Sequence, residues 1–150
     1  SLGLVGSEMC IRDSKLAIAN KERGIQMGNI HTSGEDYLET ILVLWNKQNG
    51  EVRSIDVARE LNVTKPSVSN AMKILREGKF ITMDENGFIT LTEAGRYVAE
   101  KIYEKHLVLT EWLVSLGVDR KISEHDACKI EHVLSDESFA ALKKHISEEQ

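Results

Sequence analysis

The stretch 54–92 constrains the fold more than any other part of this 150-residue chain. "SIDVARELN" begins at Ser54, a residue type that caps helices, and "PSVSNAMKILREGKF" opens on Pro66, which suits a first helical turn. The break between them is short, and apolar residues recur at helical spacing in both segments. The expected inner faces are Ile55, Ala58 and Leu61, then Val68, Ala71, Met72 and Leu75. Two short helices joined by a tight turn predict a helix-turn-helix.

The outer face of the second of these helices is polar and basic. Between Thr64 and Lys79, four basic residues stand against one acidic residue, a local net charge of +3 in a chain of net charge −5. A DNA recognition helix needs apolar groups inside and hydrogen-bonding groups toward a groove. An ordinary amphipathic surface helix has the same pattern, so this helix alone leaves both interpretations open.

The segment that follows favours DNA binding. "FITMDENGFITLT" holds two β-rich runs around Asp84-Glu85-Asn86-Gly87, and Asn-Gly between such runs is a strong hairpin signal. A helix-turn-helix followed by a small hairpin predicts a winged helix, whose wing contacts the DNA backbone.

The remaining segments predict helices, so the chain is expected to be mostly α. Apolar residues at helical spacing occupy "SGEDYLETILVLWNKQNG", the long run after Thr92 and two shorter runs toward the C-terminus. The expected helix caps are Ser33, Thr92, Ser123 and Ser135, and the expected stops are Asn49-Gly50 and Gly117.

The N-terminal residues 1–26 are left out of this fold prediction. Residues 1–14 resemble a sequencing adapter translated in frame, and residues 15–26 resemble sequence upstream of a start at Met27. We expect a non-native leader, with a genuine but disordered arm as the alternative. In that case Cys10 gives no information about the redox chemistry of the protein.

Bulk features exclude several classes of protein. The chain has no apolar run of membrane-spanning length and no secretory signal, and two cysteines make no disulfide framework, so a cytoplasmic location is expected. The acidic net charge argues against a non-specific polyanion binder. There is no H-E-x-x-H, nucleophile elbow or glycine-rich phosphate loop, so we expect neither an enzyme nor a small-molecule substrate.

One helical face near the C-terminus gathers metal-binding residue types. In "HDACKIEHVL", Cys128, Glu131 and His132 lie at i, i+3 and i+4. Further candidates earlier in the chain are Asp36, Glu39 and His106. The alternative is a set of solvated polar side chains beside a core cysteine, because this pattern is less specific than a paired Cys-x-x-Cys.

From about Ser33 to His145 the chain resembles the DtxR/MntR family of metal-dependent bacterial repressors. The motifs that carry the resemblance are "GEDYLETI", "VTKPSVSNAMKIL", "TEAGRYVAEKIYEKH" and "DACKIEHVLSDE", in this order. The resemblance implies a winged-helix DNA-binding domain over 27–92 and a helical metal-binding and dimerisation domain over 93–150. It also implies a homodimer that binds double-stranded operator DNA, represses genes of metal-ion homeostasis and needs Mn(II) or Fe(II).

The resemblance also implies which residues hold the metal: Asp36, Glu39, His106, Cys128, Glu131 and His132. Asp36 and Glu39 match manganese-type members, whereas Cys128 matches iron-type members. Carboxylates suit manganese and a thiolate favours iron, zinc or cobalt, so the set is mixed. Thr110 stands where family members often have glutamate, and an ancillary site would therefore need Glu124 and His125.

By the same resemblance, Thr64, Pro66 and Asn70 match positions that meet the operator. Asn70 suits a base edge and Pro66 a thymine methyl group. Thr64 and Ser67 suit phosphate, and Lys65, Lys73 and Arg76 are also expected at phosphates, with solvated surface side chains as the alternative for these three. The alternative function is a metal-independent winged-helix regulator in which Cys128 senses oxidation.

Overall fold

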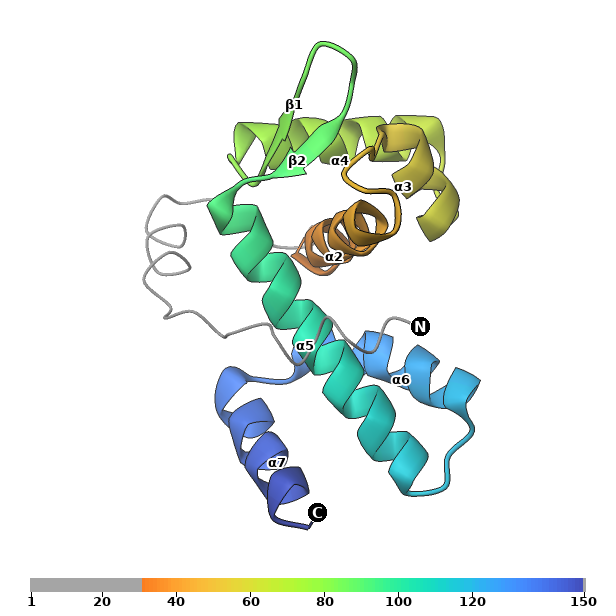
Figure 1. The fold of residues 1–150 in the computed structure, drawn as a ribbon, viewed down its shortest axis with the longest axis vertical. Helices are drawn as coiled ribbons and strands as arrows, with labels where there is room; N and C mark the ends of the chain where they lie inside the picture. Colours follow the sequence, from red (N-terminus) through yellow and green to blue (C-terminus); the bar gives the residue numbers. More distant parts are fainter. Residues whose placement is uncertain (1–30, 150) are drawn as a thin grey trace. The chain divides into compact units, whose positions relative to one another are not determined.

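A computed structural model describes residues 31–149, and the expected leader over 1–26 lies outside this range. The described part is mostly helical, as predicted, with one small sheet (Figure 1). Its elements are α2 (His31–Lys47), α3 (Ser54–Leu61), α4 (Lys65–Glu77), β1 (Ile81–Met83), β2 (Ile89–Leu91), α5 (Glu93–Ser115), α6 (Arg120–Val133) and α7 (Asp136–Glu148). The chain divides into two compact units, 31–100 and 101–149, with the boundary inside α5.

The unit 31–100 is a winged helix. Helix α2 packs against α3, α4 and β2, and α4 packs against β1. Figure 1 shows the hairpin of β1 and β2 extending beside α4. The two strands are antiparallel, with Ile81 opposite Leu91, and the Ile89 amide donates to the Val52 carbonyl at 2.8 Å. The predicted helix-turn-helix and wing are both confirmed.

The expected starts of the first three helices need small corrections. Helix α2 begins at His31, before the expected cap Ser33. Ser54 is the first residue of α3 and not its cap: the preceding residue is Arg53, whose amide donates to the Asp56 carboxylate at 2.9 Å. Helix α4 begins at Lys65, one residue before Pro66.

The expected inner face of α3 was wrong at one position. Ile55 is 42% exposed, whereas Val57 and Ala58 are buried. In α4 three residues of the expected stripe, Val68, Met72 and Leu75, are buried, and the fourth, Ala71, is half-buried. Val57 and Ala58 therefore form the buried face of α3, Leu61 is half-buried, and Ile55 is left at the surface.

The wing turn forms as the Asn-Gly signal predicts. The Asp84 carboxylate accepts hydrogen bonds from the amides of Asn86 and Phe88, both at 2.9 Å. Gly87 has φ of +81°, a conformation that glycine adopts without a side-chain penalty. This arrangement closes the loop between β1 and β2.

The start of α5 is fixed by Thr92, as expected. The Thr92 hydroxyl accepts from the Gly95 amide at 3.1 Å and donates to the Lys79 carbonyl at 2.7 Å. A Cβ atom added to Gly95 would lie 1.9 Å from the Phe80 carbonyl oxygen. The glycine thus lets α5 approach the backbone that precedes β1.

The unit 101–149 contains the C-terminal part of α5 with α6 and α7. Helix α6 is capped by Asp119, whose carboxylate accepts from the amides of Lys121 and Ile122, so the expected cap Ser123 was wrong. Ser123 is buried within α6. The cap of α7 at Ser135 is confirmed, and so is the stop after α5, where Gly117 has φ of +92°.

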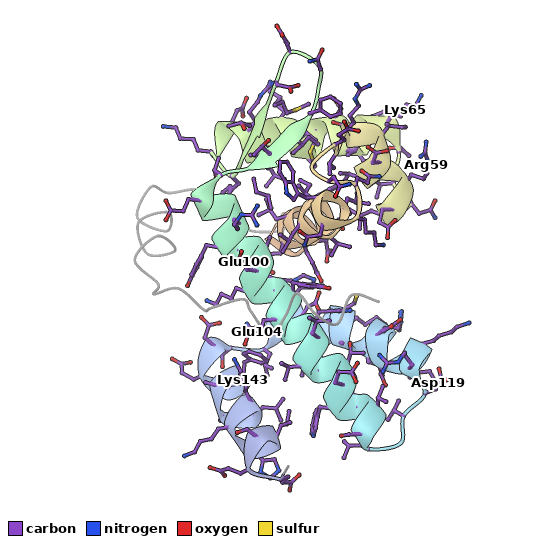
Figure 2. The ribbon with its side chains drawn as sticks, viewed as in Figure 1. Arg59, Lys65, Glu100, Glu104, Asp119 and Lys143 are labelled. Atoms are coloured by element: carbon purple, nitrogen blue, oxygen red, sulfur yellow. The ribbon has the colours of Figure 1, made fainter. Side chains whose placement is uncertain are left out.

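Helix α7 is joined to α5 by ion pairs. Lys101 and Lys105 of α5 pair with Asp136, and buried Glu104 pairs with Lys143. Figure 2 shows Glu104 and Lys143 on facing sides of these two helices.

Among the helices of residues 31–149, none has both the length and the apolar character needed to cross a membrane.

Candidate functional site

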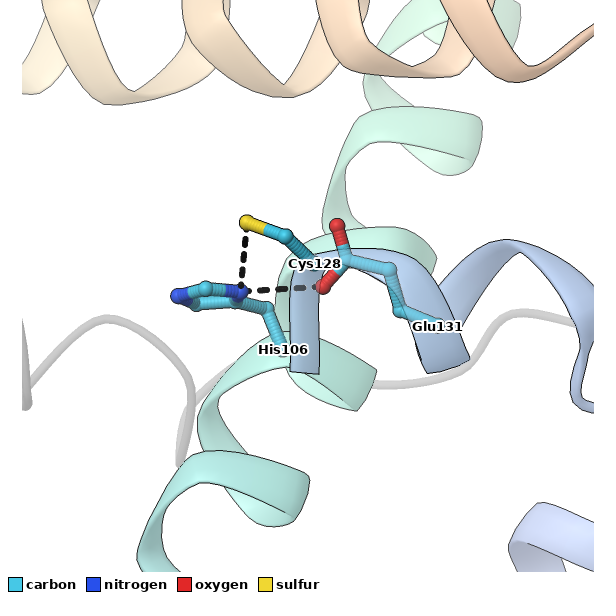
Figure 3. Close-up of side chains that lie close together, drawn as sticks. All are labelled: His106, Cys128 and Glu131. Carbon is cyan, nitrogen blue, oxygen red and sulfur yellow. Dashed lines mark hydrogen bonds and ion pairs between the residues drawn. The ribbon is translucent and has the colours of Figure 1, made fainter. Parts of the chain in front are cut away.

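The side chains of His106, Cys128 and Glu131 converge between α5 and α6 (Figure 3). His106 Nδ1 lies 2.9 Å from Glu131 Oε2 and 3.7 Å from Cys128 Sγ. Imidazole, thiolate and carboxylate atoms of the three residues all lie within 4.8 Å of one another. The structure therefore brings together three of the predicted metal ligands from two helices of one unit.

Glu131 is the buried centre of this cluster. Its side chain is fully buried, and Oε2 takes the hydrogen bond with His106. Within the described residues Oε1 has no hydrogen-bond partner, although His132 Nε2 lies 3.4 Å away. Burying a carboxylate without a full set of partners is unfavourable, and a cation would relieve that cost.

Helix geometry explains why α6 supplies several of these groups. Cys128, Glu131 and His132 follow each other at i, i+3 and i+4, so the helix presents them on one side. The buried residue Ala127 anchors the same turn. Cys128 is exposed and His106 is half-buried, which leaves the cluster open to an incoming ion.

Two of the remaining predicted ligands belong to the other unit. Asp36 and Glu39 are on α2 in the unit 31–100, half-buried one turn apart, and their role as ligands stays a prediction. Burial, with a smaller contribution from the Asp36 carboxylate, raises the pKa of the neighbouring Tyr37 above its ordinary value. Glu124 and His125 are exposed on α6, and within residues 31–149 neither belongs to a cluster of three ligand-type side chains.

The outer face of α4 carries the predicted DNA contacts. Every one of these residues is exposed: Thr64, Lys65, Pro66, Ser67, Asn70, Lys73 and Arg76. The Thr64 hydroxyl accepts from the Ser67 amide at 3.3 Å and donates to the Ser67 hydroxyl at 2.9 Å. Thr64 is thus the cap of α4 as well as a predicted phosphate contact.

A groove runs along this face of α4. Its basic and polar walls come from Lys65, Asn70, Lys73 and Arg76. Ser69, which flanks the predicted outer face, also lines the groove, and so do Ser54, Ile55 and Met83, which the sequence did not assign to this face. Ile55 comes from α3 and Met83 from β1, and nothing in the sequence pattern pointed to either of them.

Known proteins match both units. The model for the iron-dependent repressor N-terminal DNA-binding domain matches residues 29–87, and the model for the iron-dependent repressor metal-binding and dimerisation domain matches residues 92–148. An uncharacterized HTH-type transcriptional regulator of Methanocaldococcus jannaschii is 38% identical over 110 residues, which cover 73% of this chain and 88% of the relative. The chain belongs to the DtxR/MntR family.

Two further matches support membership of the DtxR/MntR family. The transcriptional regulator MntR of Escherichia coli O6:H1 is 33% identical over 109 residues, covering 73% of this chain and 70% of the relative. The solved structure of the manganese regulator SloR is 25% identical with a TM-score of 0.68, over 76% of this chain. The chain spans only 53% of the SloR chain.

Family membership confirms the expected class of protein. Members of the DtxR/MntR family are DNA-binding transcriptional regulators and not enzymes, as predicted. Both manganese and iron occur among the matched families and structures, so these comparisons leave the choice between the two metals open. Nothing in them supports the metal-independent alternative with Cys128 as a redox sensor.

Proposed function

We propose that this chain is a metal-activated repressor that binds operator DNA as a homodimer and controls genes of metal-ion homeostasis. The observation that carries the proposal is the convergence of His106, Cys128 and Glu131 in a chain whose other unit is a winged helix. A ligand cluster in one unit and a DNA-binding fold in the other would supply a sensor and an output. Because its output is operator binding, we place the protein in the cytoplasm.

The proposed ligands in the unit 101–149 are His106, Cys128, Glu131 and His132. Family resemblance adds Asp36 and Glu39. Glu131 supplies a buried charge with an oxygen lacking a hydrogen-bond partner in the described residues, and His106 is held toward it by a hydrogen bond. Bound Mn(II) or Fe(II) would supply positive charge that compensates the carboxylate and orders its ligands.

On the DNA side, α4 is the proposed recognition helix. Asn70, which is exposed, would hydrogen-bond a base edge in the major groove, and Pro66 would meet a thymine methyl group. Lys65, Lys73 and Arg76 carry the positive charge that phosphates attract. Thr64 and Ser67 share hydroxyl hydrogen bonds that hold the first turn of α4, where backbone amides also favour phosphate.

The dimer is proposed to form through the unit 101–149. Large apolar side chains are exposed there: Leu116 at 63%, Ile122 at 55% and Val133 at 83%. Such side chains on a regulator are better explained by burial against a second copy than by contact with water. Two recognition helices would then read a palindromic operator.

The decisive test is metal-dependent DNA binding by the full chain. A random-sequence duplex library is selected for binding in the presence of Mn(II), and affinity for the selected sequence is measured by fluorescence anisotropy. We expect tight binding with Mn(II) or Fe(II) and at least about a tenfold loss with a chelator, roughly 1.4 kcal/mol of coupling. Equal affinity in both conditions would refute the proposed activation.

Linkage provides an independent check of the same proposal. If metal raises the affinity for DNA, DNA must raise the affinity for metal by the same factor. The metal dissociation constant is therefore measured with and without the selected duplex. A scrambled duplex of the same length serves as the control for non-specific electrostatic effects.

A further inference from the structure

The Lys105 side chain is buried, and its ammonium group lies close to three other groups. Its ammonium donates to the Leu134 carbonyl at 2.9 Å and lies 3.2 Å from Asp136 Oδ1. It also lies 5.9 Å from the centroid of the Phe139 ring. Only 7% of the Lys105 side chain is exposed, so these contacts are shielded from water.

The hydrogen bond from Lys105 to the Leu134 carbonyl lies at the end of α6. Leu134 caps the C-terminal end of α6, three residues after Glu131 and two after His132. The carbonyl end of a helix carries partial negative charge, so a cation there is favourable. Lys105 also directly precedes His106 on α5. One side chain therefore ties the end of the ligand-bearing α6 to the turn of α5 that carries His106.

The Asp136 carboxylate strengthens the link that Lys105 makes between α5 and α6. Asp136 lies in the first turn of α7 and pairs with both Lys101 and Lys105. Burial acts to raise the pKa of Asp136, but the hydrogen bonds from the two lysines outweigh it and hold the pKa below its ordinary value. The carboxylate therefore stays charged near neutral pH and keeps the Lys105 ammonium in place.

We propose that Lys105, braced by Asp136, is a positioning residue for the metal site. By holding the C-terminal end of α6 against α5, it keeps Glu131 and Cys128 within reach of His106. The inference rests on the proposed metal-binding function and adds a residue that touches no metal. Groups that orient ligands from outside the coordination sphere commonly change metal affinity by about 10–100-fold.

Lys101 offers a matched control on the same helix. It lies one turn before Lys105 and pairs with the same Asp136 carboxylate, but the hydrogen bond to the Leu134 carbonyl comes from Lys105. Replacing either lysine with methionine removes one ammonium and keeps an unbranched stem. A difference between Lys105→Met and Lys101→Met therefore reports the contact with α6 rather than the loss of charge beside Asp136.

The experiment is a Co(II) titration of the full chain, followed by the charge-transfer absorbance of the cobalt–thiolate bond to Cys128. We expect Lys105→Met to weaken Co(II) binding by about 10–100-fold and to reduce the thiolate band per bound cobalt at saturation. Lys101→Met is expected to keep the band and to stay within a few-fold of the wild-type affinity. Thermal unfolding without metal checks that both variants fold.

Each result decides the question. Wild-type affinity and an unchanged band in folded Lys105→Met would overturn the positioning role and leave the metal site standing. Equal effects in both lysine variants would also overturn it. Absence of Co(II) binding by the wild type would refute the proposed metal site and the role of Lys105 together. If Lys105→Met does not fold, Asp136→Asn decides, because it should weaken Co(II) binding more than Lys101→Met does.

Discussion

His106 Nδ1 on α5 lies 2.9 Å from Glu131 Oε2 on α6, so one hydrogen bond joins two helices at the candidate metal site. The other carboxylate oxygen, Oε1, is buried and has no hydrogen-bond partner in the described residues. A buried polar atom left unsatisfied costs about 1–3 kcal/mol. A cation bound at the proposed site would offset such a cost more fully than the His132 imidazole, whose Nε2 lies 3.4 Å from Oε1.

Replacing Glu131 with glutamine tests this arrangement. We expect Glu131→Gln to be at least as stable as the wild type without metal, because a neutral amide is easier to bury than a carboxylate. With Mn(II) at about 100 times the dissociation constant, the wild type should gain roughly 2.7 kcal/mol and the variant almost nothing. Thermal unfolding with and without Mn(II) measures both effects. The control is Glu124→Gln, an exposed carboxylate on the same helix, and a full metal response in Glu131→Gln would contradict the assignment.

Cys128 should control which metal is preferred. Its sulfur lies 3.7 Å from His106 Nδ1 and is the one soft donor of the cluster. Cys128→Glu replaces the thiolate with a carboxylate, so we expect the ratio of Mn(II) to Co(II) affinity to rise by at least about tenfold, roughly 1.4 kcal/mol. Competition titrations against one chelator give this ratio. Cys128→Ser separates loss of the thiolate from gain of the carboxylate, and an unchanged ratio in both variants would remove Cys128 from the site.

Local signals predicted the parts of the fold that local hydrogen bonds fix. Thr92 and Ser135 cap α5 and α7 as expected, and Asn86-Gly87 turns the wing. The errors occurred where a competing neighbour decided the outcome. Asp119 caps α6 four residues before the expected Ser123, because its carboxylate reaches two free amides of the first turn.

The candidate site was only partly visible in the sequence. Helical spacing placed Cys128, Glu131 and His132 on one face, but it gave no reason for His106 to join them. That partner was predicted from family resemblance, and the packing of α5 against α6 brings it to Glu131. The Lys105 contact with Leu134 was not predicted, since it depends on where α6 ends relative to α5.

Two residues on the outer face of α4 should have different effects on DNA binding. Asn70→Ala is expected to cost about 1–3 kcal/mol and to relax specificity at one base pair, because it removes a base-edge hydrogen bond. Lys73→Met should weaken binding to all sequences and lower the salt slope by about one. Both residues are exposed, so the fold should tolerate the changes. Anisotropy titrations at several salt concentrations, on the selected duplex and on single-base variants, distinguish the two behaviours. If Asn70→Ala lowers the affinity for all duplexes equally, Asn70 does not recognise a base.

Gly95 should be the glycine least tolerant of substitution in the described part of the chain. A Cβ atom there would lie 1.9 Å from the Phe80 carbonyl oxygen, which also accepts the Thr92 amide at 3.0 Å. Relief requires α5 to move away from this backbone, so we expect Gly95→Ala to lose about 1–3 kcal/mol of unfolding free energy. Gly117→Ala is the control, since nothing lies within 4 Å of its Cβ and only its φ of +92° opposes the change, at about 1 kcal/mol. Urea unfolding without metal measures both variants, and a smaller loss at Gly95 than at Gly117 would show that α5 accommodates the methyl group.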